Sequence, residues 1–216
     1  RGGVVKLGPG IQLDMVPDLE SRELEFVSLE GRLSQAHLWL GELVHTPGLH
    51  RAVMLPTGLE ESGTPALPEL GREGDIRSVL CVPDPALERS LLHGNVGNRF
   101  GLIEPAPGLG LLSGDTVPDT PWFTSFHVDE VLPWRIERVQ QWLQQHDTGA
   151  VEIKTRDQTV DPDRVQRRLA GSGSVPRTIF VLRLGRPVVA VVTRRANNPC
   201  GERDSNPRGD EDQAPG

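Results

Sequence analysis

The sequence predicts a mixed α/β chain, in which the strands of one sheet come first and a small α+β unit follows. Two observations favour this fold class. In the first third, short apolar runs stop at glycine and proline, and two of them flank the turn of a predicted hairpin. Over residues 122–195, strand-like and helix-like segments follow the order β-α-β-α-β-β, which is typical of two helices packed on one face of a sheet.

The composition indicates a water-soluble chain with a lean core. Apolar residues make up 36% of the 216 residues, and the aromatic ones are four tryptophans and five phenylalanines. There is no apolar run of about 18 residues and no secretory leader, so we predict no membrane span and a cytoplasmic location. Cys81 and Cys200 have no partner at metal-ligand spacing, and the six histidines are scattered. We therefore expect free thiols and no metal site.

The net charge of -7 is unevenly distributed. Residues 1–121 carry 9 Lys or Arg and 17 Asp or Glu, whereas residues 122–195 carry 12 and 8. A basic segment in an otherwise acidic chain favours a polyanionic partner. An arginine-rich helix with a solvated face is the alternative explanation.

Three short strand regions are predicted before residue 57, at 4–7, at 24–40 and at 51–56. The first is an apolar run of the kind that is buried on both faces, and it stops at Gly8, Pro9 and Gly10. The second consists of two alternating segments, which should form an antiparallel hairpin about Glu30 and Gly31, because glycine readily takes a positive φ.

Residues 57–121 are expected to be a linker region with one helix. Residues 57–73 have the composition of a loop, with glycine, proline and acidic residues in no period. Asp84 is a good N-cap and Pro85 suits the first helical position, so we predict a helix that ends near residue 93. Residues 105–121 are rich in glycine and proline, and we place a domain boundary near residue 120.

The segment from 122 to 195 is the most regular part of the chain. An imperfect strand is predicted over 126–133 and a second strand over 149–156. The helix between them places its apolar residues on one face, namely Trp134, Ile136, Val139, Trp142 and Leu143. Asp161 should cap a second helix that starts at Pro162, and two final strands flank Gly185, Arg186 and Pro187. Residues 196–216 are polar and should be disordered.

Three short motifs have ordinary structural explanations. KLGPG at 6–10 can leave room for a ligand, but such a motif more often ends a strand. PGLGLLSGD at 107–115 does not have the spacing of a dinucleotide-binding turn. PDP at 83–85 is explained by helix capping.

A basic set of five residues is the candidate for binding RNA, namely Lys154, Arg156, Arg164, Arg167 and Arg168. The last three share one face of the predicted helix, since they are three and four residues apart. Guanidinium groups on one face suit contacts with phosphates. The alternative is that these residues form surface ion pairs with Glu152, Asp157, Asp161 and Asp163.

The ordered series of motifs resembles bacterial class I methyltransferases that carry a C-terminal THUMP-like domain, particularly the actinobacterial kind. The resemblance covers about residues 4–195, and its most specific elements are KLGPG, EFVSLEG and VEIKTRDQTVDPDRVQRRL. Val82 departs from the pattern, because relatives tend to have Glu there, and Gln158 stands where a glycine-containing turn is usual.

The resemblance implies an incomplete Rossmann-like methyltransferase sheet, of which residues 1–56 form the last strands only. Residues 4–7 look like its fifth strand, and residues 24–40 look like the antiparallel pair that completes it. Lys6, Gly8, Pro9 and Gly10 would then line the catalytic cleft. Residues 57–121 would be the linker region, residues 122–195 the THUMP-like α+β domain and residues 196–216 the tail.

The function that the resemblance implies is transfer of a methyl group from S-adenosylmethionine, with RNA as the partner. The family's glycine-rich turn and its ribose-binding acidic residue would both precede Arg1. We therefore expect S-adenosylmethionine in the complete protein and no cofactor for this chain alone, and the catalytic residues stay unassigned. The alternative function is that of a non-catalytic module that binds RNA or a protein partner.

Overall fold

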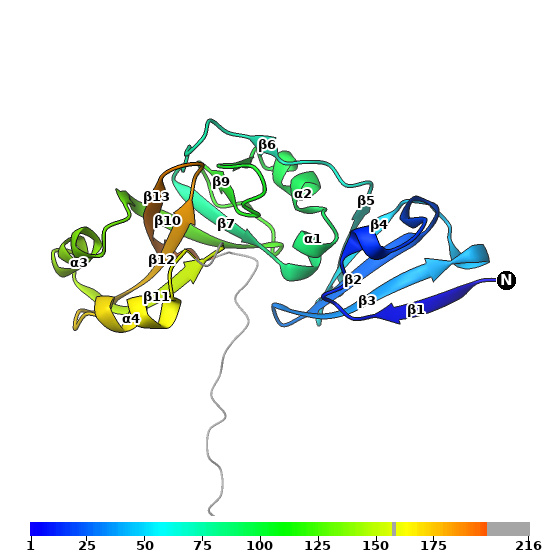
Figure 1. Cartoon of the computed structure of the whole chain (residues 1–216), viewed down its shortest axis with the longest axis horizontal. Coiled ribbons are helices and arrows are strands. Elements are labelled where there is room, and N and C mark those ends of the chain that lie inside the picture. Colours follow the sequence, from blue (N-terminus) through cyan, green and yellow to red (C-terminus); the bar gives the residue numbers. More distant parts are fainter. Residues whose placement is uncertain (157–158, 198–216) are drawn as a thin grey trace, which may run out of the picture.

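Two sheets lie side by side along the long axis of the molecule, and two short helices lie between them (Figure 1). The structure is a computed structural model and describes residues 1–156 and 159–197. Some of the predicted features lie outside the described residues, namely Asp157, Gln158, Cys200 and nearly all of the predicted disordered tail. None of the described helices is long and apolar enough to cross a membrane.

The first sheet has the strand order β1-β3-β2-β4-β5. Its strands are β1 (Gly3–Leu7), β2 (Glu23–Leu29), β3 (Arg32–Leu40), β4 (His50–Leu55) and β5 (Leu59–Gly63). β2 pairs in antiparallel fashion with β3 and in parallel fashion with β4. Three 3-10 turns cover the connections, namely η1 (Leu13–Met15), η2 (Leu19–Ser21) and η3 (Gly41–Leu43).

The predicted hairpin is confirmed as β2 and β3. Its two turn residues, Glu30 and Gly31, have φ angles of 50° and 74°. Positive φ at both central positions is the requirement of the tight turn whose twist matches the flanking strands.

β1 is an edge strand, so the expectation of a strand buried on both faces is wrong for this structure. It pairs in antiparallel fashion with β3, from Gly3 opposite Leu40 to Leu7 opposite Ala36. Its other edge pairs with no strand of the described residues. Val4 and Val5 point to opposite faces of the strand, and they are 44% and 42% exposed, so neither face of β1 is fully covered.

The second sheet has the strand order β11-β12-β13-β10-β7-β9-β8-β6. Its strands are β6 (Glu69–Leu70), β7 (Val79–Pro83), β8 (Ile103–Glu104), β9 (Leu112–Gly114), β10 (Phe123–Pro133), β11 (Thr148–Thr155), β12 (Val175–Arg183) and β13 (Val188–Arg195). Four of these strands come from residues 57–121. The antiparallel pairing of β7 with β10, such as Cys81 opposite Ser125, crosses the expected boundary near residue 120.

The description of residues 57–121 as a linker with one helix is therefore wrong. Residues 57–73 contain β5 and β6 as well as loop. β5 lies at the edge of the first sheet, where polar side chains can reach solvent. One of them, Glu61, forms an ion pair with Arg99 at 2.6 Å. The apolar run of β7 has no alternation, because β7 is central and its side chains on both faces are nearly all buried.

The single predicted helix is two helices, α1 (Pro85–Arg89) and α2 (His93–Arg99). Asp84 caps α1 as predicted, and its side chain accepts a hydrogen bond from the Ala86 N–H at 2.8 Å. The chain then breaks at Leu91, where φ is 63°. α2 contains two glycines, and its packing requires one of them: a Cβ on Gly94 would lie 2.0 Å from the Ala66 carbonyl oxygen.

The predicted β-α-β-α-β-β order of the last part is confirmed as β10, α3 (Ile136–Gln144), β11, α4 (Pro162–Leu169), β12 and β13. Asp161 caps α4 by accepting a hydrogen bond from the Arg164 N–H at 3.2 Å. The apolar faces of α3 and α4 pack on the same face of the sheet, where Val139 and Val165 lie among Val151, Ile179 and Val192.

The opposite face of the second sheet has its own core, in which Phe126 and Phe180 meet edge to face at 5.0 Å between ring centroids. A third core joins the two sheets and contains Phe26 of β2, Leu87 of α1 and Cys81 of β7. Helix α1 thus connects the first sheet to the strands that extend the second.

Candidate nucleic-acid interface

The predicted cleft residues lie at and after the carboxyl end of β1. Lys6, Gly8 and Gly10 are exposed and Pro9 is half-buried. A Cβ built on either glycine would meet no atom within 4 Å, so no part of the described chain closes over this turn. These four residues do not enclose a ligand by themselves, and they do not form a complete site for S-adenosylmethionine.

The turn after β1 is nevertheless attached to α1. The Ile11 N–H donates to the Gly8 carbonyl oxygen at 3.0 Å, and the Ile11 carbonyl oxygen accepts a hydrogen bond from the Arg89 guanidinium. That guanidinium also lies over the Phe26 ring, 5.5 Å from its centroid. The orientation of the predicted cleft turn is therefore coupled to α1.

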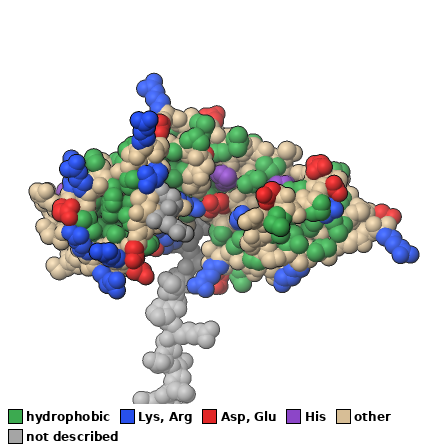
Figure 2. Space-filling view, viewed as in Figure 1, with side chains coloured by type: hydrophobic (Ala, Val, Ile, Leu, Met, Phe, Trp, Pro, Cys, Tyr) green, Lys and Arg blue, Asp and Glu red, His purple; other side chains and the backbone are tan. Residues whose placement is uncertain are grey.

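The structure divides the predicted basic set into free and paired residues. Arg164 and Arg167 are exposed on α4 and make no ion pair within the described part of the chain. Arg168 pairs with Glu137 of α3 at 2.9 Å, and both side chains are more than half exposed. Figure 2 shows several Lys and Arg side chains over the end of the molecule where α3 and α4 lie.

Lys154 and Arg156 lie at the carboxyl end of β11 and directly after it. Lys154 pairs with Glu152 at 2.8 Å, as the ion-pair alternative predicts, whereas Arg156 pairs with Glu88 of α1 at 2.8 Å. Both basic residues line a small cavity of about 340 Å³. Its other walls are mostly apolar, with Val82, Leu111, Ile153, Pro162 and Phe180 among them.

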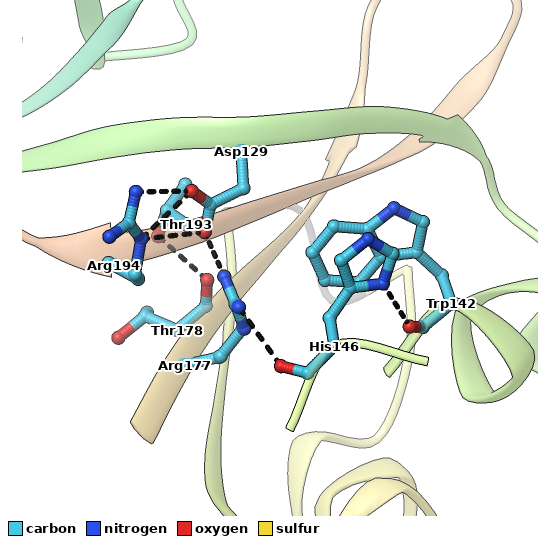
Figure 3. A network of polar contacts seen from close by, with 7 residues as sticks. All are labelled: Asp129, Trp142, His146, Arg177, Thr178, Thr193 and Arg194. Carbon is cyan, nitrogen blue, oxygen red and sulfur yellow. Dashed lines mark hydrogen bonds and ion pairs between the residues drawn. The ribbon is translucent and has the colours of Figure 1, made fainter. Parts of the chain in front are cut away.

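A second cationic group, which the sequence did not single out, is organised by Asp129 of β10 (Figure 3). Asp129 accepts hydrogen bonds from the guanidinium of Arg177 on β12 and from the Arg194 Nε on β13, the latter at 2.9 Å. Asp129 and Arg177 are nearly buried, with 12% and 8% of their side chains exposed. Because the carboxylate holds both guanidinium groups, their positions are fixed before any ligand arrives.

The other side of Arg177 is fixed by an aromatic pair. Its guanidinium carbon lies 5.0 Å from the centroid of the Trp142 ring, and its Nη2 donates to the His146 carbonyl oxygen at 3.3 Å. The rings of Trp142 and His146 are stacked, with 3.8 Å between their centroids (Figure 3). This arrangement is a cation–π contact reinforced by a hydrogen bond.

A cavity of about 670 Å³ opens beside this group, and we call it the Arg177 cavity. Its polar lining consists of His127, Glu152, Gln166, Arg177, Thr178, Arg194, Arg195 and Asn197. Thr178 and Glu152 are joined by a hydrogen bond of 3.3 Å. Among these polar residues, the three arginines supply charged hydrogen-bond donors, which suit an anionic ligand.

One sequence signal could have identified Arg177. It stands two residues before Ile179, in the phase of the strand that faces the helices, where apolar residues are expected. A charged residue at a core position requires a partner of opposite charge. Asp129 could not be found in the same way, because its pairing with Arg177 depends on the order of strands in the sheet.

Other titratable groups show the effects of burial. Burial raises the pKa of the Cys81 thiol to about 11 and raises the pKa of Asp84. Burial also lowers the pKa of His93, whose Nδ1 has no hydrogen-bond partner in the described chain. Among residues 1–156 and 159–197, no three His, Cys, Asp or Glu side chains come together as a metal site.

Comparison with known proteins identifies a domain within the second sheet. Residues 123–195 match the THUMP domain-like family, so this part of the chain is a THUMP-like domain. Over 200 residues, 92% of its length, the chain is 34% identical to an uncharacterized S-adenosylmethionine-dependent methyltransferase of Mycobacterium tuberculosis strain H37Rv. The counterpart in strain CDC 1551 has the same identity. The aligned region is 55% of each relative, so the chain spans about half the length of the curated relatives it matches.

A solved structure shares the fold. The chain superimposes on a proposed methyltransferase from Porphyromonas gingivalis W83 with a TM-score of 0.71 and 18% sequence identity. The superposition covers 91% of this chain and 51% of the other. The fold and the sequence similarity together define a homologue of S-adenosylmethionine-dependent methyltransferases that carries a THUMP-like domain.

Proposed function

We propose that this chain is the C-terminal part of an S-adenosylmethionine-dependent methyltransferase, and that the complete protein methylates RNA. In this proposal the first sheet supplies the closing strands of the catalytic domain. The THUMP-like domain and the strands that extend it hold the RNA. The residues that bind the cofactor belong to a part of the protein outside these 216 residues.

The observation that carries the catalytic half of the proposal is the similarity to the mycobacterial methyltransferases over 92% of the chain but only 55% of their length. The free edge of β1 supports it, because Val4 and Val5 are exposed on a strand whose outer edge can pair with further strands. The turn at Gly8, Pro9 and Gly10 would then form one wall of the cofactor cleft.

The observation that supports RNA as the substrate is the distribution of positive charge on the THUMP-like domain. Arg164 and Arg167 are exposed and unpaired within the described chain, and Arg168 is held only by a surface ion pair. Surface ion pairs are weak, so a phosphate can replace Glu137 as the partner of Arg168 at little cost. Three arginines on one eight-residue helix are well placed to contact adjacent phosphates.

The catalytic half of the proposal is tested by calorimetry with S-adenosylmethionine on residues 1–216. We expect no binding, because the glycine-rich turn and the ribose-binding acidic residue would lie elsewhere in the protein. Saturable binding with a micromolar dissociation constant would contradict the proposal. The longer protein serves as the positive control, since it should bind the cofactor and transfer a labelled methyl group to RNA.

A further inference from the structure

We propose that the Arg177 cavity binds a phosphate group, and that in an RNA ligand this group is a phosphodiester of the backbone. The inference rests on the proposed function for its choice of RNA, whereas the cavity itself supports a phosphate. The proposed RNA interface would then consist of the exposed arginines of α4 and a cavity with preorganised arginines beside them.

The first argument is that Arg177 is buried without using all of its hydrogen-bond donors. The residue is 9% exposed, and its Nε has no hydrogen-bond partner in the described part of the chain. An unused donor on a buried guanidinium is costly. This nitrogen is itself shielded from solvent, so the Arg177 side chain has to shift before an anion in the cavity can reach it and relieve the cost. Arg177 also lines a cavity large enough for a phosphate group.

The second argument is that the guanidinium groups are fixed in advance. Asp129 holds Arg177 and Arg194, and Trp142 packs against Arg177. Each guanidinium group has more N–H groups than these partners use, and the remaining ones can donate to the oxygen atoms of a phosphate. Little side-chain entropy is then lost when the anion binds.

The third argument is the charge of the site. Three arginines, at 177, 194 and 195, line the cavity. Glu152 in the lining and Asp129 behind it offset two of these charges, so one formal positive charge is left. This charge matches the single negative charge of a phosphodiester better than the double charge of a free phosphate monoester.

The cavity also adjoins the proposed RNA-binding helix. Gln166 of α4 lies in the cavity lining, one residue before Arg167. A strand of RNA that contacts the exposed arginines of α4 can therefore place a neighbouring phosphate in the Arg177 cavity. Asn197 is a further hydrogen-bond donor of the lining.

The test uses NMR on the whole chain, with inorganic phosphate and a single-stranded RNA 12-mer as two separate probes. The signals to follow are the side-chain Nε–H of Arg177 and the backbone amide of Thr178. Arg195→Gln is the test variant, because Arg195 is exposed and makes no ion pair within residues 1–156 and 159–197. Arg32→Gln is the matched control, since it removes the same charge from an exposed position of the first sheet, outside both α4 and the cavity lining.

We expect both probes to shift the two signals. Arg195→Gln should weaken phosphate binding about fivefold or more, and Arg32→Gln should change it less than about twofold. Thermal denaturation of both variants checks that the fold is retained. A response to inorganic phosphate without any RNA binding supports the phosphate site and overturns RNA as its source. RNA binding that leaves both signals unmoved, and that is equal in the two variants, overturns the inference and leaves the proposed function standing.

Discussion

The guanidinium of Arg156, directly after β11, donates to Glu88 of α1 at 2.8 Å and to the Gly110 carbonyl oxygen at 3.3 Å. Glu88 belongs to the helix that packs on the first sheet, whereas β11 is the outermost strand of the THUMP-like domain. The pair therefore joins the two proposed functional parts, in addition to the pairing of β7 with β10.

The Arg156 and Glu88 side chains are each about one-third exposed, at 30% and 32%. We expect a double-mutant cycle with Arg156→Ala and Glu88→Ala to give a coupling energy of about 0.2–1 kcal/mol in the free energy of unfolding. Urea denaturation measures it. A coupling energy several times larger would mean that the contact between α1 and the THUMP-like domain depends more on this ion pair than on the apolar core around Leu87.

Asp129 has a larger predicted effect, because it neutralises the buried Arg177. We expect Asp129→Ala to reduce the free energy of unfolding by about 3–5 kcal/mol, since a buried charge is left without its partner. Arg194→Ala is the control, and it should cost at most about 1 kcal/mol because 55% of that side chain is exposed. Equal effects of the two substitutions would show that Asp129 does not stabilise Arg177.

Helix α2 packs closely against residues 64–68, so adding one methyl group at Gly94 should lower the stability of the fold. A Cβ on Gly94 would lie 2.0 Å from the Ala66 carbonyl oxygen and 2.6 Å from the Pro68 nitrogen. Both are backbone atoms, so we expect Gly94→Ala to destabilise the chain by about 1–3 kcal/mol in chemical denaturation. Gly10→Ala is the matched control, because a Cβ there meets no atom within 4 Å and stability should be nearly unchanged.

The buried thiol of Cys81 predicts a dependence on pH. Burial raises its pKa from 9.0 to about 11, and a hydrogen bond with Ser125 offsets part of this shift. An acid that keeps its proton longer in the folded chain stabilises that chain below pH 9.0, and the contribution is lost as the pH rises to about 11. In a Cys200→Ser variant, the native chain should therefore resist iodoacetamide at pH 8 and the denatured chain should react. Equal rates in the two states would contradict the burial of Cys81.

The local features of the fold were predictable from the sequence, because they depend on neighbouring residues. The turn at Glu30 and Gly31 and the caps at Asp84 and Asp161 are explained by backbone angles and by hydrogen bonds within a few residues. The strands of residues 57–121 were missed because they depend on distant partners. β5 has the polar composition of a loop and is stabilised by its pairing with β4.

The candidate site was predictable only where charge is exposed. Arg164, Arg167 and Arg168 could be recognised from their spacing on one helix. The ion pair of Arg156 with Glu88 could not, because it depends on the carboxyl end of β11 meeting α1. The group around Arg177 was missed for the same reason, since it brings together residues from three strands.

The central claim is that the THUMP-like domain of this chain binds RNA through the arginines of α4. The most direct measurement is the affinity of residues 1–216 for single-stranded RNA over a series of salt concentrations, for the wild-type chain and for Arg164→Glu combined with Arg168→Glu. We predict that the double substitution weakens binding at low salt and reduces the slope of log affinity against log salt by about 1.4 units, because two phosphate contacts of about 0.7 units each are lost. Affinity and slope that are the same in the two chains, or no RNA binding by the wild-type chain at low salt, would contradict the claim.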